Sequence, residues 1–553
     1  MSPVQLIVIL LGVSAALQLV ARRFNVPHPA LLVLGGLGIA FVPGLPRVAI
    51  APETLFLVFV PPLLYWAALR TTLRDFWRAF GPIARYATLV VILTMVAVAI
   101  VVRQLSPEFT WPAAFLLGAI VAPPDPVAAI AVLRSIGAPR AISTILEGEG
   151  LVNDATALVS YQIAVAAGVA GTFSIEHAAM RFLIAAAGGI GIGLATGWLV
   201  AFARRKLIGR YPIVENTLSL LTPFIAYLPA NWINASGILS VVTIGLYLGR
   251  RGPRIVSPAT RIQAEAMWSM VQFLLESMTF ILVGLELPVV VHALRSNTFG
   301  TLVLYCALIL VTVILVRVIY TFIAVALLRL TSGRNAEPSP SWEQAAFLGW
   351  TGLRGGDSLI IALAIPFTTA SGQPFPARDL IIFVTFGVIF GTLVLQGFTL
   401  VPLLHVLHLS GGGEADGEEA HARRVVAEAG LEKLNAIAGQ RPADATVVRL
   451  LRDRYRGRLR RWAVRDRALH SGPNKDADHQ RLSDDDAGEE RHAESYRAVR
   501  GATIDAERKA VIDLRDNGTI GDDVMRRVQR ELDLESMMLD SIEDDVAEPY
   551  DEP

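Results

Sequence analysis

The chain has 553 residues, of which 53% are hydrophobic and only 18% are charged, and its mean hydropathy is +0.50. A soluble protein of this length carries closer to a quarter charged residues, so this composition excludes a soluble globular protein and indicates a polytopic membrane protein. The single cysteine, Cys306, excludes an internal disulfide.

The apolar runs predict an all-α fold with about thirteen transmembrane helices in residues 1–408, because some twenty apolar residues cross a bilayer. Arginine and lysine concentrate in the loops after odd-numbered spans. Basic loops stay cytoplasmic, which predicts an outside N-terminus and a cytoplasmic tail. The predicted spans cover residues 3–21, 29–45, 52–70, 83–103, 110–135, 141–170, 180–203, 213–230, 234–249, 264–290, 298–328, 342–367 and 379–407.

Two of these spans contain residues that break a helix. The fifth span has Pro123, Pro124 and Pro126 around Asp125, and the twelfth has four glycines around Arg354. If spans 1–6 and 8–13 are two repeats, both breaks fall in the fifth helix of a repeat, and the second repeat is inverted. Matched broken helices are typical of the midplane binding site of a transporter.

The sixth span carries polar side chains where hydrocarbon is expected. Glu149, Asn153 and Asp154 fall on one helix face at spacings of four and five. A charge at this depth costs roughly 2.5–3.5 kcal/mol and usually marks an ion pathway. A carboxylate there holds either a proton or a hard monovalent cation, and one displaces the other. We therefore predict that Asp154 binds the ion, with Asn153 beside it.

The other charges in the spans suggest a supporting network. Asp125 is expected to compensate the positive ends of half-helices, and it is also a candidate ion- or proton-binding residue. Arg354 is expected to compensate carboxylates, with Glu149 as its partner in a structural ion pair. Glu276 is a possible additional member, and Arg317 is expected either to pair with Glu276 or to extend to the interface.

From Gly411 the chain becomes charged, and residues 409–553 are predicted to form a soluble helical tail with a polar linker at about 470–490. Arginines recur from Arg449 to Arg461. Such a helix can touch anionic lipid or pair with the acidic remainder of the tail. Apolar residues between Val511 and Leu534 predict a helical hairpin. Nothing in the chain suggests an enzyme, a cofactor or a nucleic-acid partner.

Four motifs in order resemble the sodium/proton exchanger branch of the monovalent cation:proton antiporter superfamily, in particular bacterial members with a long cytoplasmic tail. The resemblance covers about residues 5–407. The motifs are Pro-Pro-Leu-Leu at 61–64, Asp-Pro-Val-Ala at 125–128, Gly-Glu-Gly-Leu-Val-Asn-Asp-Ala at 148–155 and Gly-Leu-Arg-Gly at 352–355.

The resemblance implies an inverted-repeat homodimer in the bacterial inner membrane or a plasma membrane, where it exchanges Na⁺ or Li⁺ for H⁺ in pH and sodium homeostasis. It implies an elevator-like motion, ion or proton binding at Asp154 and, from the Asn-Asp pair, electroneutral exchange. Three positions depart from the family pattern: Gly150 replaces a frequent Ser, Trp66 replaces a Glu of some members, and Asp357 replaces a small or apolar residue. Asp357 is therefore a possible additional site residue.

Several alternatives remain open at this point. A K⁺/H⁺ antiporter on the same scaffold is the nearest. A channel or a pH-sensing membrane protein with the tail as its output domain is a different class, although matched broken helices favour a carrier. An organic-anion symporter on a similar fold is a further alternative, which the bulky Leu151 and Val152 disfavour.

Overall fold

Contacts within the chain divide it into two units. The computed structural model describes residues 3–24, 28–41, 52–71, 73–125, 140–170, 175–207, 211–294, 298–331, 341–407, 409, 414–440, 445–468 and 489–547. The apolar unit comprises Met1–Ala203, Thr217–Gly252 and Ala266–Ser410. The tail unit comprises Arg204–Asn216, Pro253–Glu265 and Gly411–Pro553. The chain passes between the units several times, whereas the sequence suggested a single boundary at residue 408.

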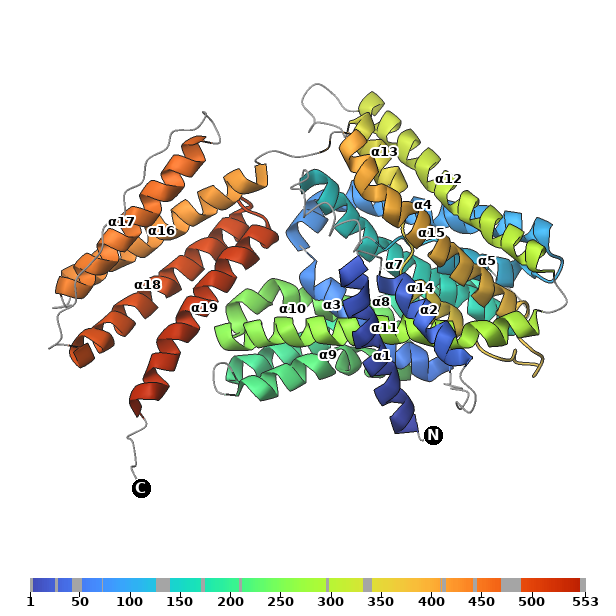
Figure 1. The fold of residues 1–553 in the computed structure, drawn as a ribbon, viewed down its shortest axis with the longest axis horizontal. Coiled ribbons are helices and arrows are strands. Elements are labelled where there is room, and N and C mark those ends of the chain that lie inside the picture. Colours follow the sequence, from blue (N-terminus) through green and yellow to red (C-terminus); the bar gives the residue numbers. More distant parts are fainter. Residues whose placement is uncertain are drawn as a thin grey trace. The chain divides into compact units, whose positions relative to one another are not determined.

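Long apolar helices build the first unit (Figure 1). Those that lie wholly or mainly in it are α1 (Pro3–Phe24), α2 (His28–Ala40), α3 (Pro52–Arg70), α4 (Leu73–Leu105), α5 (Trp111–Val121), α7 (Arg140–Ala170), α8 (Ile175–Leu207), α9 (Pro212–Trp232), α10 (Gly237–Ile255), α11 (Pro258–Ala293), α12 (Phe299–Thr331), α13 (Trp342–Trp350), α14 (Gly356–Leu363) and α15 (Arg378–Val406). Each of the thirteen predicted spans overlaps one of these helices or, in the twelfth, two.

Length and composition identify the segments that can cross a membrane. Within the described residues, Tyr86–Leu105, Leu183–Lys206, Pro258–His292, Phe299–Leu330 and Arg378–Val406 are long and apolar enough to do so, and shorter apolar helices accompany them. This supports a multi-pass membrane protein. The number of crossings and the inverted repeats stay predictions.

The helix breaks occur where the prolines and glycines predict them. α5 ends at Val121, just before Pro123 and Pro124, and residues 126–139 lie outside the described part of the chain. In the twelfth span α13 ends at Trp350 and α14 begins at Gly356, with non-helical residues between them. The backbone groups at these ends need partners other than the helix itself.

Four charged helices lie side by side in the tail unit: α16 (Glu414–Gln440), α17 (Ala445–Ala468), α18 (Glu489–Asn517) and α19 (Asp522–Ala547) (Figure 1). One apolar cluster joins α16, α18 and α19 and includes Val511, Val524 and Leu532, in agreement with the predicted hairpin, although Leu534 is largely exposed. A second cluster joins α16, α17 and α18. The predicted linker at about 470–490 lies almost wholly outside the described residues.

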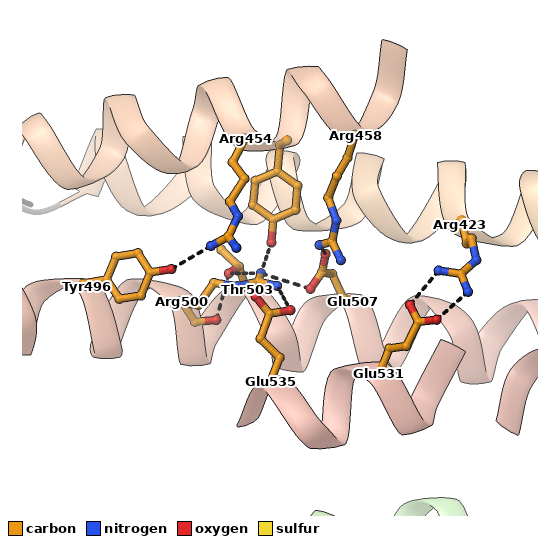
Figure 2. Close-up of polar contacts among 10 residues, drawn as sticks. Arg423, Arg454, Arg458, Tyr496, Arg500, Thr503, Glu507, Glu531 and Glu535 are labelled. Atoms are coloured by element: carbon orange, nitrogen blue, oxygen red, sulfur yellow. Dashed lines mark hydrogen bonds and ion pairs between the residues drawn. The ribbon is translucent and has the colours of Figure 1, made fainter. Parts of the chain in front are cut away.

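A buried ionic network crosses this bundle (Figure 2). Arg500, 2% exposed, donates to Glu535 at 2.6 and 2.9 Å and to Glu507 Oε2 at 3.0 Å. Arg458 lies 3.4 Å from the other oxygen of Glu507, which is fully buried. Burial raises the pKa of the Glu507 carboxyl above its ordinary value, although both arginines oppose this rise. The bundle is therefore held by charges as well as by apolar contacts.

Ion pairs also connect the tail helices to the segment Pro253–Glu265 of the same unit. Arg261 donates to Asp533 at 2.7 and 3.0 Å, and Arg508 donates to the same carboxylate at 3.2 Å. Asp533 is almost completely buried. Two arginines far apart in the sequence therefore neutralise one aspartate, which sequence patterns did not suggest.

Candidate ion-binding site

α7 presents the polar face that the sequence predicts. Glu149 and Asn153 are both buried, and Asn153 Nδ2 donates to Glu149 Oε1 at 3.1 Å, one helical turn away. The Oδ1 of Asn153 is also buried and accepts no hydrogen bond within the described part of the chain. Asp154 follows in the same helix, but its side chain lies outside the described residues.

Glu149 pairs with Arg317 of α12, and the predicted pair with Arg354 is wrong. Both oxygens of Glu149 accept hydrogen bonds from Arg317: Nη2 lies 2.9 Å from Oε2, and Nη1 contacts Oε1. Each side chain is 1% exposed. A planar guanidinium fits a carboxylate through two parallel bonds, so the pair neutralises a charge that would otherwise be buried alone. Arg317 therefore neither pairs with Glu276 nor extends to the interface.

Arg354 instead compensates the ends of the broken helices. Its Nε donates to the Val121 carbonyl at the end of α5 at 2.6 Å, and Nη1 donates to the Gly352 carbonyl at 2.7 Å. Its backbone N–H donates to Thr392 Oγ1 of α15 at 3.2 Å. The last carbonyls of a helix have no partner within it and carry partial negative charge. The breaks therefore create the acceptors that hold Arg354 away from Glu149.

Asp125 lies at the N-terminal end of α14, whereas Arg354 contacts carbonyl groups at or just after the C-terminal ends of α5 and α13. Its backbone N–H donates to the Leu353 carbonyl at 2.7 Å, which joins the two breaks directly. Its carboxyl group lies against Gly355, the N-cap residue of α14, which provides no side-chain cap. A carboxylate beside a helix N-terminus is stabilised by the exposed N–H groups and the helix dipole. The role of Asp125 as the compensator of a half-helix end stays a prediction.

The close approach at Gly355 gives a first testable prediction. A Cβ at this position collides with the Asp125 carboxyl, whereas a Cβ at Gly397 has Leu353 Cδ2, at 3.8 Å, as its nearest neighbour. We expect Gly355→Ala to cost about 1–3 kcal/mol, as overpacking does, and to slow exchange. Gly397→Ala is the matched control and should leave melting in detergent and exchange in liposomes near wild type. Equal behaviour of the two variants contradicts the proposed contact.

Asp357 and Glu276 bring two more carboxyl groups to this region. Asp357, in the first turn of α14, is exposed although most of its neighbours are buried. Glu276 of α11 is half-buried and accepts a hydrogen bond from Gln272 Nε2 at 2.7 Å. Their charges interact with each other and with Asp125. The structure thus brings three of the predicted residues together, from the break after α5, from α11 and from α14.

Arg317 is the functional residue whose role sequence reasoning missed. Its position in α12 is fixed by Thr321, whose hydroxyl donates to the Arg317 carbonyl at 2.7 Å and lies 2.6 Å from the Tyr86 hydroxyl of α4. A buried arginine in the middle of a long apolar helix was a visible signal. The choice between Arg317 and Arg354 as partner of Glu149 depends on tertiary packing and has no local signature.

Two helix breaks joined by a hydrogen bond, in a chain of long apolar helices that also holds a buried ion pair, are typical of a membrane transporter of the secondary class. Residues 7–406 match the model of the sodium/hydrogen exchanger transmembrane family. The chain belongs to this family. Its members are transporters rather than enzymes, and they exchange cations for protons.

Known relatives resemble the chain over most of its length. An uncharacterised Na⁺/H⁺ exchanger of Mycobacterium tuberculosis is 33% identical over 97% of this chain and 96% of its own length. A sodium, potassium, lithium and rubidium/H⁺ antiporter of Bacillus pumilus is 32% identical over 82% of this chain and 69% of its own. The structure of the sodium/proton antiporter NhaP1 of Methanocaldococcus jannaschii matches with a TM-score of 0.55 and 20% identity over 74% of this chain and 99% of that one. The last comparison shows a shared fold.

Proposed function

We propose that the chain exchanges Na⁺ or Li⁺ for H⁺ electroneutrally, with Asp154 as the residue that carries the ion or the proton. The observation that carries this proposal is the Glu149–Arg317 pair. Since Arg317 neutralises Glu149, that carboxylate serves as a structural anchor, and Asp154 is left as the titrating carboxylate of the α7 face. Asn153, fixed by Glu149 through Nδ2, directs a buried amide oxygen that suits a hard monovalent cation.

The arrangement around α14 supports a site exposed alternately to two sides. Asp125 compensates the N-terminal end of α14, and Arg354 compensates the C-terminal end of α5. The two joined helix breaks can therefore stay intact while they move as one body. We propose that this body slides in an elevator-like motion within a homodimer of inverted repeats. The proposed location is the inner or plasma membrane, with the N-terminus outside and the tail in the cytoplasm, and the proposed role is pH and sodium homeostasis.

A K⁺/H⁺ antiporter is the second candidate, and one feature of α3 favours it. Trp66 stands where some members have a Glu, and its ring stacks on Trp268 of α11 at a centroid distance of 5.7 Å. This position therefore packs against a helix and offers no oxygen ligand to a small cation. The Bacillus pumilus relative is named for exchange of potassium and rubidium as well as sodium and lithium, which makes broader cation selectivity a reasonable alternative.

The test is cation-driven proton movement in proteoliposomes that contain a pH-sensitive dye, with Na⁺, Li⁺ and K⁺ compared. We expect Na⁺ and Li⁺ to drive exchange, and the rate to be independent of an imposed membrane potential. Asp154→Asn should reduce the rate by at least about 100-fold, as loss of a proton-transferring group typically does, while the protein stays monodisperse.

Asp357→Asn provides the matched comparison, because it removes one carboxylate from the neighbouring cluster and leaves α7 unchanged. If Asp154→Asn retains exchange while Asp357→Asn loses it, the assignment of the carrier residue is wrong. If K⁺ alone drives exchange, the second candidate replaces the first. Exchange that depends on membrane potential contradicts electroneutrality.

A further inference from the structure

Positive charge is segregated within the tail. Residues 409–553 carry more acidic than basic side chains, yet Ala445–Ala468, which is α17, contains nine arginines and two aspartates. The structure divides the described arginines of this helix into two sets. Arg454 and Arg458 contact α18 through the Tyr496 hydroxyl at 3.1 Å and Glu507 at 3.4 Å (Figure 2). These two follow the expectation that the basic helix pairs with the rest of the tail.

The second set lies on another face of α17. Val447, Val448, Leu451 and Tyr455 are buried against α16 and α18. At 100° per residue, Arg449 and Arg456 fall on the side of the helix away from this apolar stripe, and Arg452 falls at the edge of the stripe next to Val448; we call these three the outer arginine face. Figure 1 shows α17 at the edge of the bundle.

The side chains of the outer arginine face are exposed or partly exposed. Arg449 and Arg456 are exposed, and Arg452 donates to Asn435 of α16 at 3.3 Å. Arg456 pairs with Asp453 of the same helix at 3.9 Å, and both side chains are more than half exposed. An exposed pair of this kind holds its partners weakly. The face can therefore engage a negatively charged surface without breaking the core of the bundle.

Chain connectivity points to the kind of surface. α16 begins at Glu414, eight residues after α15 ends at Val406, so the linker spans at most about 30 Å. α17 follows α16 after a short connection of residues 441–444, which makes the two helices an antiparallel hairpin. A basic helix tethered to a membrane-crossing segment through one helical hairpin meets lipid headgroups at raised effective concentration. The cytoplasmic leaflet of a membrane is anionic.

We propose that the outer arginine face of α17 binds anionic phospholipid headgroups. Each arginine near an anionic bilayer strengthens binding about fivefold, so the three together account for roughly a hundredfold preference of the docked state over the undocked one. In the sequence, Arg460 and Arg467 continue the helix in the same register. The interaction places a lipid-composition sensor in the tail, and it does not depend on which ion is exchanged.

The test uses the full chain in nanodiscs. In a Cys306→Ala background, Leu450→Cys, a largely exposed position of α17, carries an environment-sensitive dye, and nitroxide-headgroup lipids serve as quencher. We expect quenching in discs with 30 mol% phosphatidylglycerol, little in pure phosphatidylcholine discs, and a steep loss at 0.5 M salt, since the Debye length then falls to about 4 Å. The triple variant R449Q/R452Q/R456Q should shift the docking equilibrium by at least about tenfold.

Two control variants separate this face from net charge and from misfolding. K433Q/K509Q/R530Q removes the same charge from exposed positions of α16, α18 and α19 and should leave quenching unchanged. R449K/R452K/R456K keeps the charge and should keep docking. Equal quenching in neutral and anionic discs overturns the proposal, as does an equal effect of the two glutamine triples. Arginine-dependent binding of a single-stranded RNA by the chain, without quenching in anionic discs, also overturns it and assigns the face to nucleic acid.

Discussion

Replacement of Arg317 by methionine is expected to destabilise the protein by about 3–5 kcal/mol, because it leaves the buried Glu149 carboxylate without a cation. Both side chains are 1% exposed, and the guanidinium occupies both carboxylate oxygens. Arg317→Lys should recover only part of the loss, since an ammonium group cannot reproduce two parallel hydrogen bonds. Thermal and denaturant unfolding in a mild detergent, followed by size-exclusion chromatography, measures the effect.

A double-mutant cycle makes this prediction specific. Glu149→Gln combined with Arg317→Met removes both charges, so the double variant should be more stable than Arg317→Met alone, with a coupling energy of about 1–3 kcal/mol. Arg354→Met is the matched comparison. It should destabilise the protein by uncapping the Val121 and Gly352 carbonyls, and its effect should be nearly additive with Glu149→Gln. Strong coupling of Glu149 to Arg354 rather than to Arg317 contradicts the pairing seen in the structure.

The helix breaks could be predicted from the sequence because they follow from local chemistry. Prolines end α5 whatever surrounds it, and a carboxylate in a break has a natural partner in a helix N-terminus. The partner of Glu149 could not be predicted this way. Arg317 and Arg354 both lie in apolar segments, and only the tertiary arrangement that brings Arg317 of α12 to Glu149 of α7 selects between them. The helix breaks leave free the carbonyl groups that Arg354 binds. Its role therefore depends on how the broken helices are arranged in the folded protein.

In the tail, too, local packing could be predicted from the sequence but long-range ion pairs could not. Apolar spacing predicts that α18 and α19 pack together, and Val511 and Val528 are indeed buried in their common core. Apolar spacing does not reveal that Asp533 accepts hydrogen bonds from both Arg261 and Arg508, because Arg261 is distant along the chain and no local pattern marks these residues. Apolar spacing also does not show which charged side chains of the tail are buried. Arg500 and Glu507 are in fact among the most buried side chains of the bundle.

Glu507→Ala is expected to destabilise the tail bundle by about 3–5 kcal/mol, because it removes a fully buried partner from Arg500 and from Arg458. Hydrogen exchange of α18 in the full chain measures the free energy of opening of the bundle. Glu531→Ala is the matched control. Glu531 pairs with Arg423 at 2.5 Å, but its side chain is about half exposed, so its loss should cost at most about 1 kcal/mol.

The raised pKa of Glu507 determines how the stability of the tail bundle changes with pH. Burial raises the pKa of Glu507 in the folded bundle, so its contribution to stability is fully present below the ordinary glutamate pKa and is lost as the pH rises through the raised value. Glu507→Gln imitates the protonated carboxyl and should therefore cost less than Glu507→Ala. The stability of Glu507→Gln should approach that of the wild type as the pH falls toward the ordinary glutamate value. If Glu531→Ala costs as much as Glu507→Ala, or if the glutamine variant diverges from wild type at low pH, burial of this carboxylate does not control the stability of the bundle.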